Sequence, residues 1–194
     1  MRAKQPVGDP VPPSCELIEV HVAELRQLFN SIDPSPFREK DLDPKAEEFI
    51  VGWGREAPRG APLALAVYVD RTTSLGGDAA VLRDAIKEFF SNRSQVSRRQ
   101  LRQLFHIGRV SLSIGLVFLA LSIGAGDLLA SAFSGQRVGE LLRESLLIGG
   151  WVAMWRPLEI FLYDWWPIRS EARLYDRLSA MPVRIASTGD APPQ

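Results

Sequence analysis

The stretch VSLSIGLVFLALSIGAG, residues 110–126, carries no charged side chain and determines how the rest of the sequence is interpreted. It forms most of an apolar segment, Val110–Leu129, and a second apolar segment follows at Leu146–Trp166. A helix needs roughly 20 apolar residues to cross a bilayer, and both segments reach that length. The sequence therefore predicts two transmembrane helices that form a hairpin, rather than two buried helices of a soluble bundle.

Charged residues distinguish the second segment from the first. The second contains Arg156, Glu159 and Asp164, whereas the first meets only Asp127 near its end. A charge within the hydrocarbon is costly and usually has a function. Two positions for Arg156 stay open: near the midplane, paired with Glu159, or at the interface, if the span ends near Trp155.

Arginines flank the two apolar segments unevenly. Only Arg137 and Arg143 lie in the connection Ala130–Ser145, and Glu140 and Glu144 balance their charges. Basic residues in short flanks stay on the cytoplasmic side of a membrane, so we expect both termini in the cytoplasm and the connection outside. In the flanks next to the outer ends of the segments lie nine arginines: Arg93, Arg98, Arg99, Arg102, Arg109, Arg169, Arg173, Arg177 and Arg184.

Small residues recur along the first segment at a spacing of four. Ser111 and Gly115 form one such pair, and Ser122 and Gly126 form another. Small side chains let two helices approach closely within a bilayer. These four residues are predicted to pack either the hairpin itself or two copies of the chain in a homo-oligomer.

The first half of the chain has the patterns of a small α/β domain. Leu17–Val22 alternates as a strand does, and Leu63–Val69 is an apolar run typical of a strand buried on both faces. Asp43 precedes Pro44 at a predicted helix start, and this helix has Phe49, Ile50 and Trp53 on its expected apolar face. A sheet of two strands is thin, which favours its completion by a partner chain.

A long helix is predicted after the second strand. It begins near Asp78, carries apolar residues at helical spacing and continues into the first apolar segment, with a break expected near Ser91–Ser94. Beyond the second apolar segment, a stripe with arginines opposite it is typical of a helix lying in the membrane interface. The stripe comprises Ala172, Leu174, Tyr175, Leu178 and Met181.

These patterns predict an α+β membrane protein: a small cytosolic β-α-β-α domain joined to a two-helix transmembrane hairpin. Residues 1–14 are expected to be a disordered N-terminus, and residues 15–95 the cytosolic α/β domain. Residues 96–166 are assigned to a juxtamembrane helix and the two transmembrane helices. Residues 167–194 are assigned to the interfacial amphipathic helix and a flexible tail.

No pattern of catalytic, cofactor-binding or metal-ligating residues is present in the sequence. Cys15 is the only cysteine, and His21 and His106 are the only histidines, so zinc-ligand spacing is absent. The loop Asp70–Asp78 lacks the lysine and spacing of a P-loop. The formal net charge is zero, which gives no general attraction to nucleic acid. Four acids near a helix start suit its dipole without any metal: Asp41, Asp43, Glu47 and Glu48.

Two stretches together carry a resemblance to a known family. LFNSIDPSPFREKDLDPKAEEFI, residues 28–50, and WRPLEIFLYDWWPIRSEARLYDRL, residues 155–178, resemble an uncharacterised family of small bacterial membrane proteins with two spans. The resemblance implies a multi-pass protein of the bacterial inner (cytoplasmic) membrane and transfers no catalytic residue.

The functional expectation is a non-enzymatic oligomeric scaffold or regulator in the inner membrane. Its cytosolic domain would bind a cytosolic or membrane protein partner that the sequence does not identify. The alternative is a pore- or channel-forming assembly in which Arg156 and Glu159 line a polar path. The lipid bilayer is a partner in both interpretations, and no cofactor is expected.

Overall fold

The computed structural model describes residues 7–30, 41–58, 60–70, 75–133 and 137–187. The chain divides into two compact units, which we call the sheet unit and the hairpin unit. The sheet unit comprises residues 1–96 and 171–194, and the hairpin unit comprises residues 97–170. Two predictions from the sequence are confirmed: a small parallel sheet accompanied by helices, and two long apolar helices.

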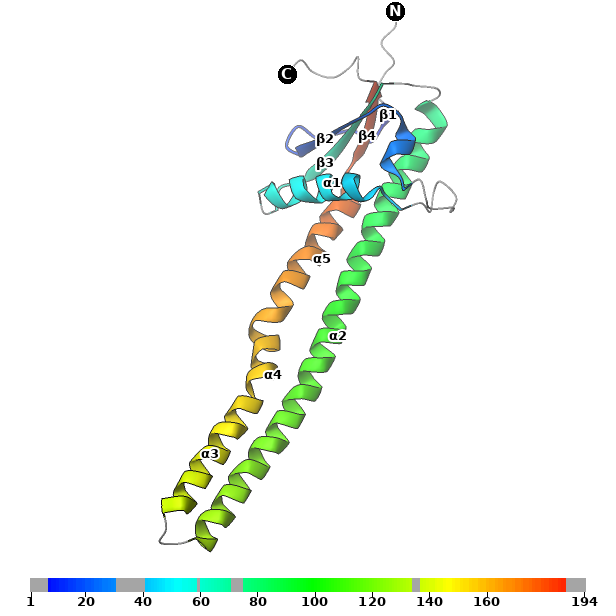
Figure 1. Ribbon diagram of the computed structural model, residues 1–194. Coiled ribbons are helices and arrows are strands. Elements are labelled where there is room, and N and C mark those ends of the chain that lie inside the picture. The colour runs from blue at the N-terminus through cyan, green and yellow to red at the C-terminus, as the bar shows by residue number, and fades with distance from the viewer. Residues whose placement is uncertain (1–6, 31–40, 59, 71–74, 134–136, 188–194) are drawn as a thin grey trace, which may run out of the picture. The chain divides into compact units, whose positions relative to one another are not determined.

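The sheet unit contains four strands and parts of two helices that continue into the hairpin unit (Figure 1). The strands are β1 (Val7–Gly8), β2 (Glu16–Val22), β3 (Leu63–Val69) and β4 (Val183–Ser187). The helical elements are the 3-10 helix η1 (Leu25–Leu28), α1 (Pro44–Glu56), the first part of α2 (Leu75–Ala132) and the last part of α5 (Trp165–Ala180).

The strands form one sheet in the order β1-β4-β3-β2. Strands β2, β3 and β4 are parallel, and β1 is antiparallel to β4. In the register of the central pair, Leu65 lies opposite Val183 and Val69 opposite Ser187. The expectation that a partner chain completes the sheet is wrong, because β4 comes from this chain, after the second apolar segment. Its five residues include Arg184 and Ser187, which weakened the strand pattern.

Strand β3 is the centre of the core, and all seven of its residues are buried, as predicted. Leu65 and Val67 belong to the main apolar cluster, together with residues of α1, α2 and α5. On the opposite face, Ala66 and Tyr68 form a separate small cluster with Ala186. Ala64, Ala66 and Tyr68 on this face are all buried. Strand β3 is therefore buried on both faces, and each face belongs to a different cluster.

Helix α1 begins as predicted but presents a different face to the core. Asp43 caps it, with its side chain accepting a hydrogen bond of 2.9 Å from the backbone N–H of Lys45. Ile50 is fully buried, whereas Phe49 and Trp53 are 45% and 52% exposed, so the predicted apolar face that grouped the three is not the face that turns inward. Gly54 lies on the inward face with Ile50, and a Cβ added there would meet Leu174 and Leu178 of α5 at 3.1 and 3.4 Å, so this small residue lets that face approach α5.

Helix α2 is continuous from Leu75 to Ala132, so the break expected near Ser91–Ser94 is absent. One of these polar residues, Ser94, donates a hydrogen bond to α5. Ser94 is 3% exposed, and its hydroxyl donates to Asp176 Oδ1 at 2.5 Å. A buried serine that is hydrogen-bonded to a neighbouring helix does not interrupt its own helix.

The apolar stripe of α5 lies in the core of the sheet unit, which differs from the interfacial location expected for it. Leu178 is fully buried, and Met181 is 2% exposed. Arg177 lies on the other side of the helix and donates a hydrogen bond of 2.7 Å to the carbonyl of Ala61. The amphipathic pattern was correct, but a helix facing a sheet and a helix facing lipid have the same periodicity.

Residues 7–14, expected to be disordered, include a strand and an ion-paired aspartate. Asp9 pairs with Arg83 at 3.2 Å and Lys87 at 3.1 Å. Burial alone would raise the pKa of Asp9, but Lys87, Arg83 and the N–H of Val183 together hold that pKa below its usual value. Residues 1–6 and 188–194, for which disorder and a flexible tail were expected, lie outside the described residues.

Leu178→Ala tests the core position of the α5 stripe. Truncation of a fully buried leucine costs about 2–5 kcal/mol, so we expect a clearly lower thermal midpoint for the extracted protein. The matched control is Leu162→Ala, because Leu162 is 56% exposed and its truncation should change the midpoint little. Circular dichroism measures both thermal midpoints. Equal midpoints for the two variants would contradict the core position of Leu178.

Candidate functional site in the helical hairpin

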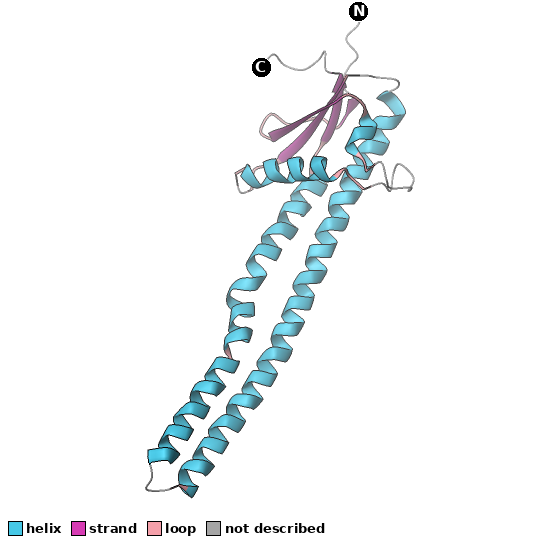
Figure 2. Ribbon diagram, viewed as in Figure 1, coloured by secondary structure: helices cyan, strands magenta, loops and turns pink. Residues whose placement is uncertain are grey.

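The hairpin unit consists of two antiparallel helical arms (Figure 2). Helix α2 supplies the first arm. The second arm comprises α3 (Arg137–Ala153), α4 (Trp155–Glu159), the π-helix η2 (Ile160–Asp164) and the start of α5. Both arms are long and apolar enough to cross a membrane. Within the described residues, only 17% of the most apolar stretch of each arm is buried, whereas a core helix of a soluble protein is mostly buried.

The outer surface of the hairpin unit is apolar around much of its circumference. Ile114 is 65% exposed and Leu116 is 50% exposed, although these two residues lie on nearly opposite sides of α2. On the second arm, Ile148 and Val152 are 63% and 67% exposed. An apolar surface of this extent marks contact with a membrane or with another protein.

The two arms meet along a seam of small residues. A Cβ added to Gly115 would lie 3.0 Å from the sulfur of Met154 and 3.2 Å from the carbonyl of Ala153. Gly126 faces Arg143, and Gly108 faces Ile160, where an added Cβ would come within 2.8 Å. Ser122, Gly115 and Gly126 are all buried, and Ser111 is half-buried. Three of the four predicted helix-packing residues, Gly115, Ser122 and Gly126, therefore lie where the two arms meet, which was one of their two expected roles.

The same contacts give the register between the arms. Gly108 faces Ile160 and Gly115 faces Ala153. A step of one residue forward along the first arm therefore corresponds to a step of one residue backward along the second arm. Arg156 therefore lies at about the level of Leu112, roughly one helical turn from Arg109.

Three charged side chains gather on the second arm, and all three were expected within the span. Arg156 Nη1 lies 3.1 Å from Glu159 Oε2 and 3.4 Å from Asp164 Oδ2. The indole of Trp155 donates to Glu159 Oε1 at 3.0 Å. The Arg156 side chain is nevertheless 64% exposed. The cluster thus holds one positive and two negative charges on the outer surface of the hairpin unit, and the second carboxylate was not anticipated as a partner.

The fourth predicted charge, Asp127, forms a separate ion pair. It accepts a hydrogen bond of 2.9 Å from Arg143 Nε, which links the two arms. The two side chains are 58% and 62% exposed. Because Gly126 faces Arg143, this pair lies beside the closest approach of the arms, near the connecting loop.

Pro157 explains why the second arm is irregular. Proline has no N–H, so the carbonyl of Ala153 cannot receive the usual helical hydrogen bond. Helix α3 ends at that residue, and the wide turn η2 follows α4. The π-helix brings Asp164 near enough to Arg156 to form the second ion pair. Wide turns of this kind occur frequently at functional sites.

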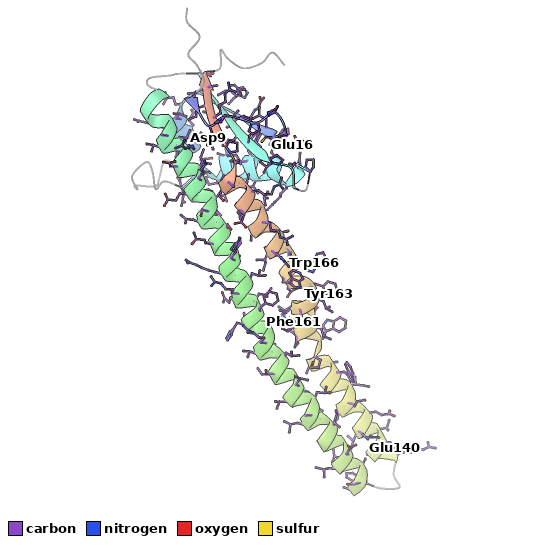
Figure 3. All side chains as sticks on the ribbon, turned by 180° about the vertical axis from the view of Figure 1, so that it is seen from behind. Asp9, Glu16, Glu140, Phe161, Tyr163 and Trp166 are labelled. Carbon is purple, nitrogen blue, oxygen red and sulfur yellow. The ribbon has the colours of Figure 1, made fainter. Side chains whose placement is uncertain are left out.

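A groove of about 540 Å³ lies between the arms beyond the charged cluster, away from the connecting loop. Its lining is aromatic and aliphatic except for one arginine, and sequence reasoning missed it because the residues come from both arms. Phe105 lies between Phe161 and Trp165, with ring centroids 6.2 and 6.4 Å away. Figure 3 shows Phe161 directed toward α2, in contrast to Tyr163 and Trp166. The lining residues are Leu101, Phe105, Phe161, Trp165 and Arg169.

The described residues contain no group of three or more metal-ligating side chains. Of the acids near the start of α1, Asp43 caps the helix, and Glu47 pairs with Arg93 at 2.7 Å. In the loop Asp70–Asp78, residues 71–74 lie outside the described part. Asp43 and Glu47 therefore have structural roles.

Comparison with known proteins gives no family for the chain: no family model, no curated protein and no solved structure matches it. The resemblance to small two-span membrane proteins stays a prediction from the two stretches quoted above.

Gly115→Leu tests the seam, and Gly124→Leu is its matched control on the same helix. A Cβ at Gly115 meets the second arm, whereas a Cβ at Gly124 meets nothing within 4 Å. We expect Gly115→Leu to separate the arms and lower the thermal midpoint in mild detergent, and Gly124→Leu to leave it near the wild-type value. If both variants melt with the wild type, the close approach of the arms is wrong.

Proposed function

We propose that this chain is a non-enzymatic scaffold or regulator of the bacterial inner membrane, anchored by the hairpin unit. The sheet unit would lie in the cytoplasm and bind a protein partner there. The main support for the proposal is the outer surface of the hairpin unit. The small residues lie between the arms, and the large apolar side chains lie on the outside. Lipid would cover such a surface around its whole circumference.

The sheet supports a topology with both ends on one side. Strands β3 and β4 precede and follow the hairpin in the sequence and are direct neighbours in the sheet. A chain that pairs these strands crosses a membrane an even number of times. The arginines favour the cytoplasm as the common side, because basic flanks are retained there.

The spacing of charges along the hairpin supports a span between Arg109 and Asp127. The uncharged stretch between them, residues 110–126, is about 25 Å long as a helix. A hydrocarbon core is about 30 Å thick, and long side chains at the ends can reach the headgroups. In this frame Arg156, at the level of Leu112, lies about 5 Å inside Arg109. This favours a place near the cytoplasmic interface over the midplane.

The charged cluster on the second arm supports a homo-oligomer. Arg156, Glu159 and Asp164 pair with each other but keep an exposed surface, and together they retain one negative charge. Arg156, which this register places about 5 Å inside Arg109, carries a cost where it faces lipid. A second copy that covers it would remove that cost, and the alternative of a pore would instead turn the cluster toward water.

Reconstitution of the purified full chain separates these functions. For a scaffold we expect light scattering in mild detergent to give a mass of two or more chains, and liposomes to show no ion flux above empty vesicles. In the matched variant Arg156→Gln, the two carboxylates lose their partner, so the oligomer should weaken. A monomeric wild type would contradict the oligomeric scaffold. Flux that Arg156→Gln changes would favour the pore.

A further inference from the structure

We propose that the groove lined by Leu101, Phe105, Phe161, Trp165 and Arg169 binds one anionic phospholipid of the cytoplasmic leaflet. Its phosphate would lie at Arg169, and the glycerol end of one acyl chain would lie against the aromatic side chains. This inference rests on the proposed membrane anchoring. It adds a specific ligand site that the anchoring alone does not require.

The groove has one charged end and one apolar end, as a phospholipid does. Arg169 and Leu101 lie at the end farther from the connecting loop, and Phe105 and Phe161 lie at the end nearer to it. Arg169 follows Phe161 by about 12 Å of helix. By the register between the arms, the groove lies on the cytoplasmic side of Arg109. If the hairpin spans the bilayer as proposed, the cationic end therefore lies among the headgroups, and the aromatic end lies at their boundary with the hydrocarbon. A free anion would need no apolar extension, and a neutral lipid would need no cation.

Arg169 is available for a phosphate. Its guanidinium lies over the ring of Trp165, with the Cζ atom 5.4 Å from the ring centroid. The indole is itself held by a hydrogen bond of 2.9 Å from its Nε1 to the carbonyl of Phe161. Within the part of the chain that the structure describes, no carboxylate pairs with Arg169, whereas Arg156 and Arg143 both have acidic partners. Stacking fixes the guanidinium plane and leaves its N–H donors for phosphate oxygens.

The aromatic part of the groove suits an acyl chain. Phe105, Phe161 and Trp165 line most of the open groove of about 540 Å³, together with Leu101 and Arg169. Tryptophan is enriched where a bilayer meets water, so Trp165 is well suited to the boundary between headgroup and chain. Arg102 follows Leu101 on α2, is exposed, and adds positive charge on the first arm at the same end. Both the charge and the apolar lining therefore fit a phospholipid.

Native mass spectrometry of the full chain in detergent tests the site. The probes are dioleoyl-phosphatidylglycerol and dioleoyl-phosphatidylcholine at equal concentration. One arginine near an anionic surface corresponds to about a fivefold preference, so we expect the wild type to favour phosphatidylglycerol by about that factor. Arg169→Gln should remove the preference. Arg137→Gln, a matched charge change at the other end of the hairpin, should keep it.

Leu101→Trp tests the acyl part separately by filling the groove while leaving Arg169 in place. We expect it to reduce binding of both lipids together, with circular dichroism confirming that the helices persist. The proposal is overturned if Arg169→Gln keeps the preference, if Arg137→Gln loses it equally, or if Leu101→Trp changes neither lipid. Displacement of the lipid by millimolar inorganic phosphate would also overturn it, because the site would then bind free anions.

Extraction with alkaline carbonate distinguishes this proposal from the proposed function. Wild-type protein that stays in membranes but shows no lipid preference contradicts the groove site and leaves the anchor intact. Protein that carbonate releases, yet which keeps the preference in detergent, contradicts the anchor and supports the groove as a lipid site.

Discussion

The pairing of β4 with β3 is the interaction on which the rest of the structure depends. Five residues beyond the second arm return to the sheet begun before the first arm, and they lie parallel to its central strand. This pairing buries Val183 and Ile185 in the main cluster and gives Asp9 a backbone partner. It also requires the two ends of the hairpin to return to one sheet, which restricts any membrane topology to an even number of crossings.

The hairpin unit uses small residues where a soluble bundle would use large ones. Gly108, Gly115 and Ser122 bring the arms together and leave leucine, isoleucine, valine and phenylalanine on the outside. In water this arrangement would expose apolar surface, and in lipid it would not. The Arg156 cluster also lies on this outer surface. In a membrane, a second copy of the chain or the headgroup region would have to solvate its charges.

The periodicity and composition of the sequence predicted the elements that depend only on residues close together in the chain. The strand Leu63–Val69, the cap at Asp43 and the two apolar segments were all evident in the sequence, since period and composition determine them. What failed depended on distant contacts. The stripe at Leu178 could face lipid or a sheet, and only β4 decides between them. The face of α1 depends on Gly54 meeting α5, and the groove at Phe105 requires the register between the arms.

Spin-label accessibility at Val117 tests the central claim, that the outer surface of the hairpin lies in lipid. Val117 lies near the middle of the uncharged stretch and is 60% exposed. With Cys15 replaced by serine, a label at Val117→Cys in liposomes should collide often with oxygen and rarely with a water-soluble nickel complex. A label at Glu48→Cys, on exposed α1, should show the reverse. Equal collision of the nickel complex with both labels would contradict the membrane anchor.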